Sequence, residues 1–280
     1  MSTSNLYATL AEYKAFATAR TQTASTDAID DATLTTMLEG VSRYVDGPAG
    51  ANVQFYPSVE TRLYDAPDSR DLRIDGPLLE VTTFLNGDSS TVTSNQYTLH
   101  SPNKTPYWKI ALRDNATISW YTTSGSYEQA LSITGVWGWR SKYAQRGWSS
   151  AGTLGAAITD TTTLAFTMTV GHTVAVGQIL KIGSEFYNVA AVSTNTITPN
   201  KRGDNGSTAA THLSGDTVYM WNVQEEVKLA VLETALGVAA LRNGQANSGK
   251  VSITSAGIVI RPEEVPPMAQ RVFDNYRSPL

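Results

Sequence analysis

The sequence predicts an α+β fold with a core of about four helices, a unit of short strands and an inserted small all-β domain. Three observations lead to this prediction. Residues 31–45 carry apolar side chains at helical spacing, whereas residues 55–148 shift toward the two-residue period of strands. Residues 149–221 contain 14 threonines and only 7 charged side chains among 73 residues. Threonine is β-branched, so this composition favours strands.

Two helices are expected in the first 54 residues. Thr9 and Glu12 have the spacing of a capping box, which predicts a helix reaching about residue 21. A second helix is expected from Asp30 or Asp31, whose carboxylates suit a helix N-terminus, to the stop signal at 47–48. One stripe of apolar side chains defines it: Leu34, Met37, Leu38, Val41, Tyr44 and Val45.

Short strands are expected over the middle of the chain, separated by glycine and asparagine turns. In the strand unit they cover 59–64, 78–85, 97–99, 108–112, 117–120 and 130–137. In the inserted domain they cover 174–177, 179–182, 186–192, 196–198 and 217–221, and residues 149–152 form a hinge at its entry.

Helix is expected again over 223–241, apolar on most faces and therefore buried. After an alternating segment at 252–260, Pro266 and Pro267 start a last helix. The predicted domains are thus a core of 1–148 and 222–280 and a β-rich insertion of 149–221.

Composition excludes several classes of function. The 280 residues include 36 threonines, 25 serines and no cysteine, which excludes disulfide scaffolds, thiolate metal sites and cysteine catalysis. The net charge of −4 argues against a general nucleic-acid binder. The first residues lack the pattern of a signal peptide, and no apolar stretch is long enough for a bilayer, so a soluble cytoplasmic protein is the default expectation.

Motifs that carry chemistry are missing from the sequence. His100, His172 and His212 have no metal-ligand spacing, and no nucleophile elbow, P-loop or dinucleotide fingerprint is present. The acidic pairs 30–31, 225–226 and 263–264 lie where helices should begin, which favours a helix-dipole role. We therefore expect no catalytic residue, metal or cofactor. A hydrolase would need an active site assembled from distant positions.

One segment, 137–148, mixes basic and aromatic residues, a combination that suits stacking and cation–π contacts. Its candidate interface residues are Trp139, Arg140, Lys142, Arg146 and Trp148. The competing interpretation is a strand end whose tryptophans are buried while the arginines and lysine stay in water. A second basic spot, 201–206, is typical of a turn.

Several segments follow one another in a recognisable order: 6–14 (LYATLAEYK), a helix of the type 31–44, 61–65 (TRLYD), 77–82 (PLLEVT), 95–99 (NQYTL), 133–138 (ITGVWG) and 266–277 (PPMAQRVFDNYR). Together they resemble head–tail connector proteins (adaptor or head-completion proteins) of tailed bacteriophages with long non-contractile tails. The resemblance covers about 1–148 and 222–280, which would form a helical connector core. Residues 149–221 depart from the shorter family pattern and are similar to a small β-module of phage structural proteins.

The resemblance implies a structural virion protein of the neck, not an enzyme, and this protein would be found in the host cytoplasm during assembly. Such proteins form a ring, usually of twelve copies, beneath the portal protein, and present a surface to the next neck or tail protein (a stopper or tail terminator). Genomic DNA passes through the ring without specific binding, and no membrane is involved.

Within this family we expect the portal contact to come from the last helix, because aromatic and arginine side chains carry interface energy. Its residues are Met268, Arg271, Phe273, Tyr276 and Arg277. The alternative for this helix is packing on its own domain. The alternative function is a carbohydrate-binding or host-attachment module of a virion, which would need exposed aromatic side chains.

Overall fold

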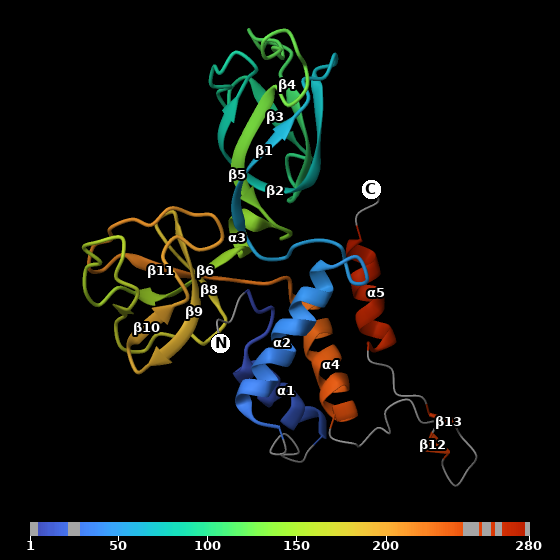
Figure 1. The fold of residues 1–280 in the computed structure, drawn as a ribbon, viewed down its shortest axis with the longest axis vertical. Helices are drawn as coiled ribbons and strands as arrows, with labels where there is room; N and C mark the ends of the chain where they lie inside the picture. The colour runs from blue at the N-terminus through green and yellow to red at the C-terminus, as the bar shows by residue number, and fades with distance from the viewer. Residues whose placement is uncertain (1–4, 22–28, 243–251, 254–258, 261–264, 278–280) are drawn as a thin grey trace.

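Two antiparallel β-sheets and a smaller group of helices build the molecule (Figure 1). The computed structural model describes residues 5–21, 29–242, 252–253, 259–260 and 265–277. The expected fold class is wrong: this is a mostly-β protein rather than a helical core with strands added to it. Sheets of five and six strands dominate the described part of the chain, which has five short helices.

The five-stranded sheet encloses its own hydrophobic core, which is why it is a unit and not an appendage of the helices. Its order is β1-β5-β2-β4-β3, with all neighbours antiparallel. Phe84, Ile133 and Trp137 are fully or almost fully buried in it. The strands are β1 (Ser58–Tyr64), β2 (Asp71–Leu85), β3 (Tyr97–His100), β4 (Tyr107–Leu112) and β5 (Leu131–Trp137).

The six-stranded sheet has a second, separate core around Leu180, Tyr187 and Ile197. Its order is β6-β11-β8-β9-β10-β7. The strands are β6 (Trp148–Thr153), β7 (Phe166–Thr167), β8 (Ile179–Ile182), β9 (Glu185–Ser193), β10 (Thr196–Pro199) and β11 (Thr217–Trp221). The hinge expected at 149–152 is wrong, because these residues pair with β11 inside β6.

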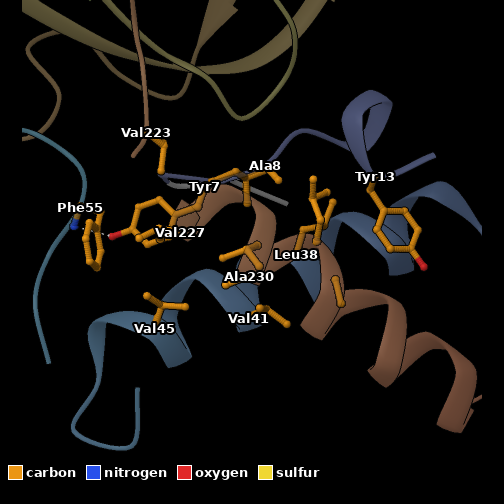
Figure 2. Packing of buried hydrophobic residues seen from close by; sticks show 14 of the residues in the cluster. Tyr7, Ala8, Tyr13, Leu38, Val41, Val45, Phe55, Val223, Val227 and Ala230 are labelled. Atoms are coloured by element: carbon orange, nitrogen blue, oxygen red, sulfur yellow. Dashed lines mark hydrogen bonds between the residues drawn. The ribbon is translucent and has the colours of Figure 1, made fainter. Parts of the chain in front are cut away.

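The helices pack against one another beside the six-stranded sheet, as Figure 1 shows in blue, orange and red. They are α1 (Leu10–Thr21), α2 (Asp31–Asp46), α4 (Glu225–Arg242) and α5 (Pro267–Tyr276). In Figure 2, Leu38, Val41 and Val45 of α2 face Val227 and Ala230 of α4, and Tyr7 lies across the end of this seam.

Local signals placed these helix starts correctly. Thr9 and Glu12 form the expected capping box, with Thr9 N–H donating to Glu12 Oε2 (2.8 Å) and Glu12 N–H to Thr9 Oγ1 (3.2 Å). Asp30 is the N-cap of α2 and accepts from Thr33 N–H at 2.9 Å. Glu225 and Glu226 lie in the first turn of α4, whereas residues 263–264 lie outside the described residues.

Some expected strands are absent and others are longer. Residues 117–120 and 174–177 are irregular, although strands were predicted there. Strand β2 begins at Asp71, seven residues before the predicted 78, because the chain stays extended through Gly76 and Pro77. Between α4 and α5, β12 (Ser252–Ile253) pairs with β13 (Val259–Ile260). Among the described helices, none has the length and apolarity needed to cross a membrane.

Candidate functional site

The last helix, α5, is fixed on the body of the protein by three of its five candidate residues. Phe273 is fully buried, and the Tyr276 ring lies 4.5 Å from Trp139 and 5.2 Å from Phe55 between ring centroids. Arg277 donates from Nη2 to the carbonyl oxygen of Gly50 at 2.9 Å. These side chains are therefore engaged within the chain.

The other two candidate residues of α5 point away from the body. Met268 is 72% exposed and Arg271 is also exposed, and neither has a hydrogen-bond or ion-pair partner among the described residues. Of the five predicted interface residues, three therefore hold α5 on the rest of the protein and two face the solvent.

The basic-aromatic segment 137–148 forms the joint between the two sheets, where the short helix α3 (Tyr143–Arg146) lies (Figure 1). Its tryptophans face inward. Trp139 lies 6.0 Å from Phe55, and Trp148 lies 5.0 Å from Trp221, between ring centroids. Lys142 and Arg146 remain exposed, as the competing interpretation expected.

Arg140 departs from both sequence interpretations because it is 1% exposed. Its guanidinium donates to both carboxylate oxygens of Glu225, at 2.7 and 2.9 Å, and to Gln224 Oε1 at 2.8 Å. The hydrogen bond from Arg140 holds the pKa of Glu225 at about 2. The arginine expected in solvent therefore ties the joint to the first turn of α4.

A cleft of about 530 Å³ opens at this joint, within the usual size range of ligand pockets. The five-stranded sheet, α3 and strand β8 line it, so it borders both sheets. Eight of its eleven lining residues are aromatic or aliphatic, and the other three are Glu80, Thr105 and Lys181. The lining residues are Leu79, Glu80, Val81, Tyr97, Leu99, Thr105, Tyr107, Tyr143, Ala144, Trp148 and Lys181.

Lys181 gives this cleft a cation without a carboxylate partner. Its ammonium lies over the rings of Trp148 (4.9 Å) and Tyr219 (5.8 Å), and it forms no ion pair among the described residues. Burial lowers the pKa of Lys181, while the nearby charge of Glu80 opposes that shift. Glu80 itself accepts a hydrogen bond from the Tyr143 hydroxyl at 3.1 Å.

A second polar cluster is enclosed in the six-stranded sheet around Glu185, whose exposed fraction is 0%. Arg202 donates to its two oxygens at 2.8 and 3.0 Å, and His212 donates from Nε2 at 3.0 Å. The backbone amides of Gly203 and Ala210 donate at 2.9 Å each. Burial raises the pKa of Glu185, but these donors outweigh it and hold that pKa at about 2. Every oxygen is satisfied inside the protein, so the cluster is structural.

A metal-binding group is not found in the described part of the chain. No group of three or more histidine, cysteine, aspartate or glutamate side chains there could hold a metal ion. The histidines are dispersed: His212 serves Glu185, while His172 contacts the carbonyl oxygen of Thr194 at 2.8 Å and His100 ends β3.

Sequence reasoning missed the cleft because its residues come from five separated segments. One signal was available: Lys181 is a lone charge in an apolar strand, within a region that has only 7 charged residues. A charge at such a position needs a structural reason. No protein-family model, curated protein or solved structure matches this chain.

Proposed function

We propose that the protein is a structural virion component that forms a ring beneath the portal and joins a phage head to its tail. The order of segments described above resembles head–tail connector proteins. The observation that carries the proposal is the state of α5, a helix fixed by Phe273, Tyr276 and Arg277 that presents Met268 and Arg271 to solvent.

A helix held in this way is preorganised for a partner. Because α5 is already ordered on α4, docking would not have to order it, and less free energy is lost on association. Methionine and arginine are both enriched in protein–protein interfaces. The partners on this proposal are further copies of the chain, the portal protein and the next neck or tail protein, with DNA passing through.

Four of the six tryptophans do not favour the carbohydrate-binding alternative, whereas the exposed rings are tyrosines such as Tyr121 and Tyr127, at 41% and 59%. Trp137 and Trp221 are buried, at 0% and 5% exposure, and Trp139 and Trp148 pack on other rings. A sugar-binding face would require such rings in contact with solvent.

The test is the assembly state of the purified chain, alone and with portal protein, by mass photometry and negative-stain microscopy. We expect a closed ring with a central hole near the width of duplex DNA. The double variant Met268→Asp, Arg271→Glu should lose portal binding, whereas Lys201→Glu, in the exposed segment that follows β10, should retain it. A trimer, or a monomer that never joins a portal, would refute the proposal.

A further inference from the structure

The cleft at the joint borders an incomplete part of the five-stranded sheet. Strand β2 pairs with β5 along Leu78–Leu85, but β4 leaves it after the pair Leu78 and Tyr107. From residue 79 to residue 83, no described strand pairs with the other edge of β2. The segment that follows, at Phe84 and Leu85, is covered by Val92 and Thr91.

The side chains of β2 show that this edge faces the cleft. Side chains alternate between the two faces of a strand, yet three consecutive residues, 79–81, line the cavity. The next two, Thr82 and Thr83, are exposed. Two β-bulges in the pairing with β5, at Leu78/Glu80 and Val81/Thr83, turn the strand here.

Strand β3 also contributes to the lining of the cleft and is the outermost strand of the same sheet. Tyr97 and Leu99 of β3 line the cleft, and the Tyr97 ring contacts Phe84 of β2 at 5.6 Å between centroids. Arg113 Nε already donates to the Tyr97 carbonyl oxygen at 3.0 Å, so part of this edge is in use. Side chains of β2 and β3, two strands of one sheet, therefore both line the cleft.

Unpaired strand edges bind extended peptides through backbone hydrogen bonds, while pockets select alternate side chains. Natural proteins usually protect such edges by covering them or by placing charges there. Here the unpaired edge of β2 is short, flanked by bulges and recessed in a cleft. It is therefore protected from pairing with the edge of another sheet, but a single extended strand can reach it.

The charges of the cleft define what that strand carries. The Lys181 ammonium is half-buried over two aromatic rings and has no carboxylate partner among the described residues. The Glu80 carboxylate lines the same cleft and accepts a hydrogen bond from the Tyr143 hydroxyl, but it keeps its negative charge, which is the one like charge that an acidic side chain would meet there. The hydroxyls of Tyr97 and Tyr107 have no protein hydrogen-bond partner in the described part of the chain, so they add donors for an anion.

We propose that this cleft captures an extended segment of a partner protein, which adds as a strand to β2 and places an acidic side chain against Lys181. Strand capture at this cleft does not require a ring, so it goes beyond the proposed function and can be tested separately.

The probes are nine-residue peptides of alternating threonine and valine with a central glutamate, glutamine or lysine. Binding to the full chain is measured by fluorescence anisotropy at low salt, and amide protection of 79–83 by hydrogen exchange. We expect the glutamate peptide to bind at least tenfold more tightly than the lysine peptide, and to protect these amides. Lys181→Met should abolish the preference for glutamate, whereas Lys201→Met, an exposed lysine elsewhere, should leave it intact.

A fourth peptide, methylated on alternate backbone nitrogens, tests strand addition itself and should not bind. The proposal is overturned if the methylated peptide binds as well as its parent, or if glutamate and lysine peptides bind alike. It is also overturned if no peptide protects 79–83 at millimolar concentration, or if an oligosaccharide of glucuronic acid binds the cleft and the peptides do not. Failure of these peptides with an intact ring would leave the proposed function standing.

Discussion

The substitution Glu185→Gln should destabilise the six-stranded sheet far more than its small change in shape implies. Five donors converge on this carboxylate: two from Arg202, one from His212 and the amides of Gly203 and Ala210. Glutamine keeps one acceptor oxygen and directs an NH₂ group at donors. Arg202, whose side chain is only 5% exposed, would then be a buried cation without its counter-charge.

Two independent routes give the same size of effect. Removing one partner from a buried ion pair costs about 3–5 kcal/mol. The pKa of Glu185 falls from its ordinary 4.5 to about 2, and at about 1.4 kcal/mol per unit this corresponds to roughly 3 kcal/mol. Because the folded state lowers this pKa, the stabilisation is complete above about pH 5 and is lost as the pH falls toward 2.

Native-state hydrogen exchange of the full chain measures this effect locally. In the variant, amides of β8 and β9 should exchange roughly a hundredfold faster at pH 7, while those of β5 in the other sheet should not change. Wild type should lose this protection toward pH 2, whereas the variant should show a flatter pH dependence. Lys201→Gln is the control: its side chain is 64% exposed, so its loss should change stability by less than about 0.5 kcal/mol. An effect of Glu185→Gln below about 1 kcal/mol, or one equal in both sheets, would refute the reasoning.

Three further outcomes are expected. Burial raises the pKa of Asp46 to about 6, so urea denaturation should show about 1 kcal/mol of added stability from pH 7 to pH 5, a gain that Asp46→Asn abolishes. Gly206→Ala should lower the free energy of unfolding by about 2–3 kcal/mol in thermal denaturation, because φ is +76° there and a methyl group would meet the Val59 carbonyl oxygen. Gly215→Ala, where φ is +89° but the space is open, should lower it by only about 1 kcal/mol. Glu225→Gln should lower the free energy of unfolding by about 3 kcal/mol in chemical denaturation, because it leaves the buried Arg140 guanidinium without its counter-charge. Arg140→Met should lower it by only about 1–2 kcal/mol, because the carboxylate it leaves is exposed. Equal losses would contradict this asymmetry.

Local patterns in the sequence predicted local structure well. The apolar stripe from Leu34 to Val45 and the Asp30 cap placed α2 correctly, because helix periodicity and capping involve residues within one or two turns. The alternation at 59–64 likewise found β1. Residues 174–177 show the limit: a short apolar run has strand composition, but no neighbouring strand pairs with it.

The predicted fold class is wrong because it rests on the helical patterns in the sequence. Those patterns do not show which elements enclose a hydrophobic core. The strands of 58–137 bury Phe84, Ile133 and Trp137 among themselves, and nothing within any one strand reveals that they close a separate core. The cleft was missed for the same reason, since Glu80 and Lys181 are about a hundred residues apart in sequence and line the same cleft only because the two sheets pack side by side. Long-range contacts of this kind have no local signal.

The charge-poor region 149–221 offers a more general way to locate function. In an ordinary surface, an isolated lysine or glutamate is uninformative, because charged residues are common there. In this region charged side chains are few, and the structure gives two of them defined environments: Glu185 is enclosed by five donors, and Lys181 is held over two rings at the cleft. The first has all its partners inside the chain and is structural. The second lacks a carboxylate partner among the described residues, and that difference, rather than charge alone, makes Lys181 the better candidate for contact with another molecule.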